Sequence, residues 1–278
     1  MDSNAGKPKV SVLMTAYNSQ AYIGLAIESI LNQTFSDFEF LIVDDCSTDS
    51  TWQIISDYAK KDLRLKAFKN ESNLGISKNR NQLINLVNTE FIAWQDADDI
   101  SLPTRLADLF EFMVAHPKVG ILGGYLQFFN EIQGDLSIRK YLLTDSEIRK
   151  KIFRFSPVAQ PAAMVRVSAL KKIGGFDENL SVAEDLDVSF KIGLNFEFVN
   201  LPKVLIKYRQ QANSITFKKL KTLELNTLKI RRLFAFNAGY KISFFDLIYN
   251  LGQLITLYLM PAKLRVGLFN LIRNKKDE

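Results

Sequence analysis

The sequence predicts an α/β protein in which a mostly parallel sheet is flanked by helices. Between residues 10 and 94, short apolar runs alternate with stretches of helical periodicity, as in strands joined by crossover helices. The runs VSVLMT and FEFLIV are largely apolar, which is typical of strands covered on both faces. Polar residues directly follow the clearest runs, and ligands of such sheets bind outside the carboxyl ends of the strands. One binding crevice is therefore expected along that edge.

The expected elements follow in order along the chain. Strands are expected at 10–15, 38–43, 63–68 and 91–94, and helices at about 23–31, 51–60 and 75–87. Ser19 or Asn18 is expected to cap the first helix, and Asp49 or Ser50 the second. Beyond Pro103 the pattern is mixed, with helices expected at 106–115, 145–155 and 184–193, strands at 119–129, 161–166 and 203–208, and a turn at 174–177. From about residue 217 the pattern is helical.

Length and charge suggest one large domain with an appendage. Of the 278 residues, 218–278 carry 12 Lys/Arg against 4 Asp/Glu, a net charge of +8, whereas the rest carries 24 against 26, a net charge of −2. We expect a catalytic domain at 1–216, with a nucleotide-binding half at 8–100 and an acceptor half at 101–216. The remaining 217–278 are expected to form a basic amphipathic helical tail.

The scarcity of histidine and cysteine restricts the chemistry. His116 and Cys46 are the only residues of their types, so neither a zinc site nor a catalytic triad is readily built. His116 is expected at the surface and Cys46 as a packed small residue. Acid–base catalysis should therefore depend on carboxylates.

Two acidic clusters follow expected strands. Asp96, Asp98 and Asp99 crowd together and should repel unless a cation such as Mg²⁺ or Mn²⁺ is bound. An isolated cluster of this kind is more often a solvated loop with helix-capping acids, but its place at a strand end favours the cation. Asp45 follows the second strand and, with Asp49 serving as the helix cap, would be free to accept a hydrogen bond from a nucleotide base.

Six segments together carry a family resemblance. They are VSVLMTAYN, FEFLIVDDCSTDST, NLGISKNRNQLI, FIAWQDADD, GGFDENL and AEDLDVSFKIG. In order and spacing they resemble the family-two glycosyltransferases of the GT-A fold, of the type that builds bacterial cell-envelope glycans. The resemblance covers roughly residues 8–215, and the combination is far more specific than any one segment.

The resemblance implies roles for particular residues. The nucleotide would be bound by Thr15, Ala16, Tyr17, Asn18, Asp45, Arg80 and Asp96, and the metal ion by Asp98, Asp96 and Asp99. The acidic pair Glu184-Asp185 would supply the catalytic base, with Asp185 the better match. By themselves, acids at a helix start are equally explained by the helix dipole.

Two departures from the family pattern matter. Many members carry YRxH after the last strand, and the His of that motif reaches the metal. This chain has Tyr208-Arg209-Gln210-Gln211, so Gln211 stands in the place of that His. The QxxRW segment of processive synthases is absent. Transfer of a single sugar is therefore expected, with inversion, from a nucleotide-sugar such as a UDP-sugar to a hydroxyl of a glycan or lipid-linked acceptor.

Two other functions remain open on the sequence. A metal-dependent nucleotidyltransferase would also cluster aspartates on an α/β sheet, but it would normally carry a glycine-rich phosphate loop, and neither GxGxxG nor GxxxxGK occurs. A catalytically inert nucleotide-binding module on a membrane would bind UDP without transferring sugar.

The tail predicts contact with an anionic membrane surface. Basic residues are interleaved with long apolar stretches, which favours a membrane over nucleic acid. Asp246, Asn250 and Gln253 interrupt the apolar stretch and make a spanning helix unfavourable. Lys263, Arg265, Arg273, Lys275 and Lys276 are expected to meet lipid phosphates. The alternative is that these helices pack on the catalytic domain or in an oligomer. The start MDSNAGKPKVSV resembles no secretion leader, so we expect a cytoplasmic protein peripheral to the inner face of the plasma membrane.

Overall fold

A computed structural model describes residues 7–210, 219–237 and 239–274. The strands are β1 Val10–Ala16, β2 Phe38–Asp44, β3 Leu65–Lys69, β4 Phe91–Asp96, β5 Ile100–Ser101, β6 Val119–Asn130, β7 Gly134–Arg139, β8 Met164–Arg166 and β9 Glu197–Arg209. The helices are α1 Ile23–Leu31, α2 Thr51–Lys61, α3 Ile76–Leu86, α4 Arg105–Ala115, α5 Asp145–Lys151, α6 Val167–Ile173, α7 Glu184–Gly193, α9 Leu220–Phe234, α10 Phe244–Leu259 and α11 Ala262–Asn274. The protein has the predicted α/β fold.

One sheet runs through the catalytic domain in the order β3-β2-β1-β4-β8-β6-β9-β5, and β7 pairs with β6. β1 to β4 are all parallel, and β6 is parallel to β9. The short strand β8 is antiparallel to both of its neighbours and so joins the two parallel parts. Residues 8–100 and 101–216 therefore contribute strands to one continuous sheet.

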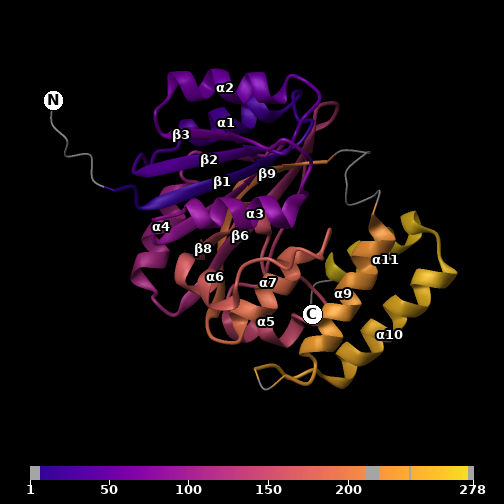
Figure 1. The fold of residues 1–278 in the computed structure, drawn as a ribbon. Helices are drawn as coiled ribbons and strands as arrows, with labels where there is room; N and C mark the ends of the chain where they lie inside the picture. Colours follow the sequence, from indigo (N-terminus) through magenta and orange to yellow (C-terminus); the bar gives the residue numbers. More distant parts are fainter. Residues whose placement is uncertain (1–6, 211–218, 238, 275–278) are drawn as a thin grey trace.

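Side chains alternate across the central strands into two cores. Val12 and Met14 of β1 face the core that α1, α2 and α4 cover, whereas Leu13 faces the core beneath α3, α6 and α7. In Figure 1, α1 and α2 accordingly lie on one side of β1 and β2, and α3 lies on the other. Because both faces are buried, the strands can be apolar at nearly every position, as the sequence predicted.

Several predicted elements needed correction. The expected strand at 161–166 begins with a 3₁₀ turn, Gln160–Ala162, and only Met164–Arg166 joins the sheet. Asn18 and Ser19 do not cap α1 with their side chains, since the residue before the helix is Tyr22. Asp49 does support the start of α2, because its Oδ1 accepts the Thr51 N–H at 2.9 Å. β7 and α6 are elements that the sequence did not predict.

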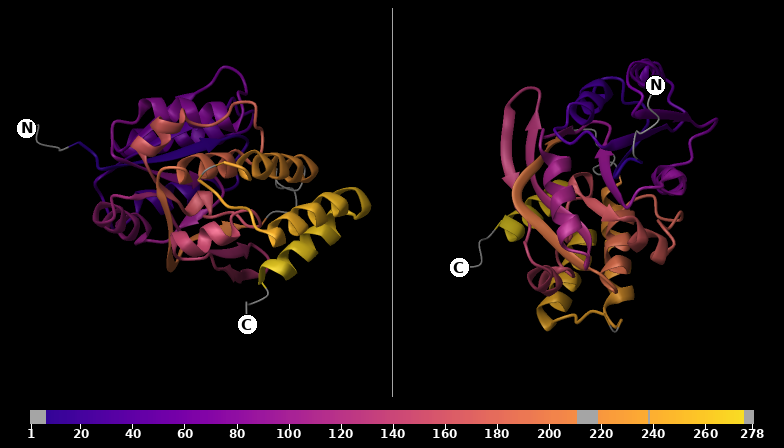
Figure 2. Two further views of the ribbon diagram at one scale, coloured as in Figure 1. Left: turned by 90° about the horizontal axis from the view of Figure 1, so that it is seen from below. Right: turned by 90° about the vertical axis from the view of Figure 1, so that its left-hand side faces the viewer.

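The first tail helix belongs to the catalytic core. Ile230 and Phe234 of α9 are buried in the core beneath α7, and Phe234 stacks on Phe190 with ring centroids 5.0 Å apart. The Tyr240 hydroxyl donates to the Phe190 carbonyl at 2.7 Å. The left view in Figure 2 shows α10 and α11, in yellow, extending to one side of the rest of the chain. For α9, the packing alternative is therefore confirmed.

Two basic residues expected at lipid phosphates are engaged inside the protein. Arg265 forms an ion pair with Glu224 at 2.8 Å. The Arg273 guanidinium lies 4.8 Å from the centre of the Tyr141 ring. Both side chains, which were expected at lipid phosphates, thus have partners within the protein. Lys275 and Lys276 lie outside the described residues. Over the described ranges, no helix combines the length and apolarity needed to cross a bilayer.

Candidate active site

The carboxyl ends of β1, β2 and β4 meet at one edge of the sheet. β1 pairs with both neighbours, so that Thr15 lies opposite Asp96 and Ala16 lies opposite Asp44. The Asp45 N–H donates to the Ala16 carbonyl at 2.8 Å, which extends this contact beyond the strands. The structure thus brings together the polar segments that the sequence predicted to line one crevice.

The segment after β1 is fastened to the segment after β2. Asn18 has a positive φ of 48°, and its side-chain oxygen accepts the Thr48 N–H at 2.9 Å. In return, the Asn18 N–H donates to Ser47 Oγ at 2.9 Å. These bonds occupy Asn18 in shaping the loop, whereas the neighbouring Tyr17 side chain is 48% exposed. Both residues are exposed, and the Tyr17 ring offers a flat aromatic surface to a ligand.

Asp45 is not the free carboxylate that the sequence suggested. It accepts the N–H groups of Leu74 and Gly75 at 2.8 and 2.9 Å, and the Asn70 amide at 2.9 Å. Burial acts to raise the pKa of Asp45, but these hydrogen bonds outweigh it and lower the pKa below its ordinary value. The ionised carboxylate therefore holds the loop before α3 against the crevice. The sequence missed these partners because two of them are backbone groups about thirty residues away.

Arg80 of α3 connects the two halves of the site. Its guanidinium forms an ion pair with Glu184 at 2.7 Å and lies 4.0 Å from Asp96. It also lies 5.2 Å from the ring centres of both Trp94 and Phe176, which hold it on two sides. The arginine is buried, so its charge acts on both carboxylates with little screening by water. Arg80 therefore joins the loop after β4 to the start of α7.

The acidic loop carries perturbed charges. Asp96 keeps 37% of its side chain exposed, yet loss of hydration in the crevice raises its pKa to about 6. The neighbouring Asp98 and Glu184 raise it further, whereas Arg80 and the buried Arg105 act to lower it. At neutral pH the carboxylate is ionised but poorly neutralised. A cation would relieve this repulsion.

Asp185 is the carboxylate best suited to take a proton. It follows Ala183 and Glu184 at the start of α7, where Ala183 adopts a left-handed conformation with φ 66°. Burial raises its pKa to about 6, with a further increase from Glu184, while Arg80 and the Leu186 N–H act to lower it. Glu184 is paired with Arg80, whereas among the described residues no arginine forms an ion pair with Asp185, whose Oδ1 accepts the Leu186 N–H at 2.8 Å.

Comparison with known proteins identifies the family. Residues 11–174 match the glycosyl transferase family 2 profile. The chain belongs to glycosyltransferase family 2. It is 34% identical over 264 residues to an uncharacterized glycosyltransferase of Methanocaldococcus jannaschii, with 90% of each chain covered. It is 27% identical over 263 residues, 93% of this chain and 94% of the other, to the UDP-Gal:α-D-GlcNAc-diphosphoundecaprenol β-1,3-galactosyltransferase of Escherichia coli.

Solved glycosyltransferases share the fold. The structure of residues 1–349 of S. aureus TarS in complex with UDP matches with a TM-score of 0.61 and 26% identity, over 96% of this chain and 88% of that one. The Pyrobaculum calidifontis mannosyltransferase in complex with GDP-Man and Mn²⁺ matches with a TM-score of 0.62 at 15% identity, over 95% of this chain and 79% of that one. The second likeness shows the fold alone. Together these matches establish the chain as a glycosyltransferase.

In this family 2 glycosyltransferase a buried network shapes the acidic loop from behind. The Gln95 amide donates to the carbonyls of Asp96 and Asp99 at 3.0 and 2.9 Å. Its oxygen accepts from Ser101 at 2.6 Å and from the fully buried Arg105 at 3.0 Å. None of these three supporting residues was predicted from the sequence. Gln95 is buried because β4 is covered on both faces, but its partners depend on how the chain returns after the loop.

Arg209 at the end of β9 holds the loop from the other side. Its backbone N–H donates to Asp99 Oδ1 at 2.9 Å, and its Nε donates to the Asp98 carbonyl at 2.7 Å. The guanidinium lies between the rings of Tyr22 and Phe129, 4.3 and 4.5 Å from their centres. Arg209 belongs to the segment that departs from the family pattern, but no role was predicted for it from the sequence. The residue considered there was Gln211, which lies outside the described residues.

The donor set suits a hard cation that keeps positions open for substrate. Asp99 Oδ2 is buried and has no hydrogen-bond partner among the described residues, and burial beside Asp96 and Asp98 raises the pKa of Asp99 well above its ordinary value. A cation would satisfy such an oxygen. Within the described ranges, no group of three or more His, Cys, Asp or Glu side chains is arranged as a complete metal site.

Proposed function

We propose that this glycosyltransferase moves a single sugar, with inversion, from a UDP-sugar to a hydroxyl of a glycan or lipid-linked acceptor. The observation that carries the proposal is the position of Arg80, whose guanidinium is close to both Asp96 and Glu184. It joins the strand edge where such sheets bind ligands to the helix that bears the candidate base. The proposed donor site and the candidate base therefore lie on either side of Arg80.

The nucleotide would lie along the carboxyl ends of β1, β2 and β4. The residues proposed to contact it are Thr15, Ala16, Tyr17, Asn18, Asp45, Arg80 and Asp96. The exposed Tyr17 ring can stack on a base, and the loop held by Asp45 forms the adjacent wall. The UDP bound to TarS and the UDP-galactose in the name of the Escherichia coli relative support a uracil nucleotide.

A divalent cation, Mg²⁺ or Mn²⁺, would be held by Asp98 and Asp96. Asp99 would contribute through its unpartnered Oδ2, since Oδ1 is bonded to Arg209. The cation would neutralise the charge that develops on the departing diphosphate. The Mn²⁺ bound to the Pyrobaculum mannosyltransferase supports the same assignment only through the shared fold.

Asp185 would act as the base. The acceptor hydroxyl oxygen forms a bond to the anomeric carbon as the bond from that carbon to the diphosphate oxygen breaks, and the hydroxyl proton passes to Asp185. Because one displacement occurs with one base, the configuration at the anomeric carbon inverts. Glu184 would support this step by orienting Arg80 rather than by taking the proton.

We also propose that the enzyme works on the inner face of the plasma membrane, where a lipid-linked acceptor is presented. The diphosphoundecaprenol in the name of the Escherichia coli relative supports an acceptor of this kind. The net charge of +8 on the tail supports contact with an anionic surface.

The test is UDP release from a panel of UDP-sugars with Mn²⁺, first selected by thermal shift. Asp185→Asn should keep UDP binding and lose about 10²- to 10⁴-fold in turnover, the usual span for a general base. Asp187→Asn is the matched control, because Asp187 lies on the same helix but is paired with Lys191 at 2.7 Å. If wild-type protein binds UDP but transfers no sugar, it is an inert binding module and the proposal fails.

A further inference from the structure

Helix α10 is amphipathic in the reverse of the usual sense. Its polar residues Asp246, Asn250 and Gln253 face the protein, and Asp246 is only 2% exposed. Its outward face is apolar and includes Phe244, Ile248, Leu251, Ile255, Tyr258 and Leu259, all exposed. A helix on the surface of a globular protein normally buries its apolar stripe and turns its polar side to water. An apolar face directed outward therefore indicates a surface that meets another apolar phase.

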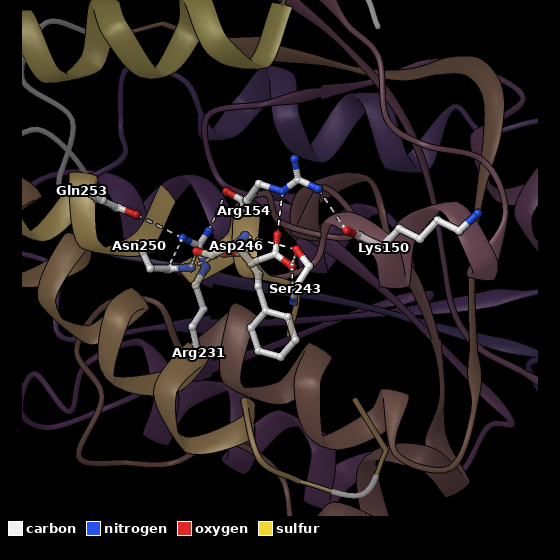
Figure 3. A network of polar contacts seen from close by, with 8 residues as sticks. Lys150, Arg154, Arg231, Ser243, Asp246, Asn250 and Gln253 are labelled. Atoms are coloured by element: carbon white, nitrogen blue, oxygen red, sulfur yellow. Dashed lines mark hydrogen bonds and ion pairs between the residues drawn. The ribbon is translucent and has the colours of Figure 1, made fainter. Parts of the chain in front are cut away.

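Polar contacts with the catalytic domain fix this orientation. Arg154, which follows α5, forms an ion pair with Asp246 at 2.7 Å. Arg231 of α9 donates to the side-chain oxygens of Asn250 and Gln253 at 3.2 and 3.0 Å, and to the Arg154 carbonyl at 2.7 Å. Figure 3 shows these side chains converging between α10 and the domain.

The helix cannot turn its apolar face inward without breaking this network. Rotation would carry Asp246 away from Arg154 and leave the buried Arg231 without Asn250 and Gln253, and breaking a buried polar contact of this kind costs far more than exposing a leucine. The Asn250 amide adds a bond to the Phe153 carbonyl at 2.9 Å. The outward apolar face is therefore a built feature of the fold.

Helix α11 extends the same surface. It contacts α10, and its Leu264, Leu268 and Leu271 are exposed. The connection between the two helices is short, Met260 and Pro261. We call the exposed apolar side chains of α10 and α11 together the apolar hairpin face.

The exposed charges of the described tail are of one sign. Both acids of the described tail are neutralised internally, Glu224 by Arg265 and Asp246 by Arg154. In the described part of the tail, the exposed charged residues are Lys219, Lys221, Lys229, Arg232, Lys241 and Lys263. Such charges complement an anionic surface, whereas two copies placed face to face would bring like charges together.

We propose that the apolar hairpin face inserts into the headgroup region of an anionic bilayer, with the exposed lysines at the lipid phosphates. Apolar burial supplies the anchoring and the lysines supply preference for anionic lipid. The inference deepens and rests on the proposed function, because it names the surface that brings the enzyme to its membrane. It differs from the sequence expectation in two ways. Arg265 and Arg273 contact other residues of the protein, and apolar burial supplies most of the membrane affinity.

The experiment measures co-sedimentation of the full chain with vesicles of phosphatidylcholine and phosphatidylglycerol in equal parts. Leu251→Ser/Ile255→Ser should weaken partition by at least about tenfold, because two side chains leave the bilayer. The matched control is Leu63→Ser/Ile132→Ser, which removes two side chains exposed by 95% and 94% elsewhere on the domain and should bind as wild type. Lys221→Gln/Lys263→Gln should weaken binding about fivefold per lysine.

Three results would overturn the proposal. They are no sedimentation of the wild type, equal sedimentation of wild type and Leu251→Ser/Ile255→Ser, or no effect of the lysine changes. A concentration-dependent dimer abolished by Leu251→Ser/Ile255→Ser, without vesicle binding, would assign the face to a second copy instead. Calorimetry of UDP with Mn²⁺ on the same samples separates the inferences. If the wild type binds UDP but not vesicles, only the proposal for the apolar hairpin face is refuted. If it binds vesicles but not UDP, only the proposed catalytic function is refuted.

Discussion

Replacing Arg80 with methionine should destabilise the protein because it leaves Glu184 buried without its cation. Methionine keeps an apolar stem between Trp94 and Phe176, so that the loss falls mainly on charge rather than on packing. Glu184 is 7% exposed, and its carboxylate bonds directly to the Arg80 guanidinium at 2.7 Å. The variant thus isolates the junction between α3 and α7.

The magnitude follows from that burial. Removing one member of a buried ion pair costs about 3–5 kcal/mol, because the remaining charge is desolvated and unpaired. Loss of the cation–π contacts with the two rings adds about 1 kcal/mol. Arg80→Met/Glu184→Gln removes both charges, so its cost should fall short of the sum of the single variants by about 2 kcal/mol.

Urea unfolding followed by circular dichroism measures these differences, provided that the slope with denaturant is unchanged. Lys60→Met is the control, since Lys60 pairs with Asp57 at 3.0 Å with both side chains largely exposed and should cost below about 1 kcal/mol. An Arg80→Met cost equal to that of the control, or simple additivity in the double variant, would refute the reasoning.

Three further predictions concern the site. Calorimetry in the presence of Mn²⁺ should show that Asp98→Ala weakens UDP binding by at least about tenfold, or 1.4 kcal/mol. EDTA should weaken UDP binding to the wild type but not to this variant. The exposed control Asp57→Ala should behave as the wild type in both measurements. Burial raises the pKa of Asp185 to about 6, and the base must be ionised to accept a proton. The value of kcat/KM should therefore be constant above about pH 6 and fall about tenfold per pH unit below it. A flat profile down to about pH 4 would assign the role of base to another residue. Gln95→Leu should lower the free energy of unfolding by about 2 kcal/mol, because Ser101 and Arg105 each lose a buried hydrogen bond, and should raise KM for the donor. Unchanged values of both would remove Gln95 from its positioning role.

The first half of the fold was predictable because its elements have a strong period. The strands β1, β2 and β4 are buried on both faces and appear in the sequence as apolar runs, and the helices between residues 23 and 86 show regular spacing. β9 was harder because Pro202 interrupts it. The pairing with β6 shifts register there, from Gly123 opposite Asn200 to Tyr125 opposite Val204, so the strand accommodates a residue without an N–H.

The edge of the candidate site was predictable, but its supports were not. Parallel strands bring their carboxyl ends together, so Asp45 and Asp96 could be assigned to one crevice from local patterns alone. The partners of Asp99 and Glu184, in contrast, are Arg209 and Arg80, each more than a hundred residues away along the chain. Such pairs depend on tertiary packing, and no local period identifies them.

The polar residues of α10 show how one pattern supports two different inferences. Asp246, Asn250 and Gln253 recur at a spacing that places them on one face of a helix, and in the sequence they appeared only as obstacles to crossing a membrane. In the structure they attach the helix to Arg154 and Arg231, and this attachment directs the apolar side outward. Composition therefore indicated that the tail is apolar and basic, whereas the direction of its apolar face depends on Arg154, far away in sequence. The same polar stripe that prevents α10 from spanning a bilayer is what keeps its apolar face available to lie on one.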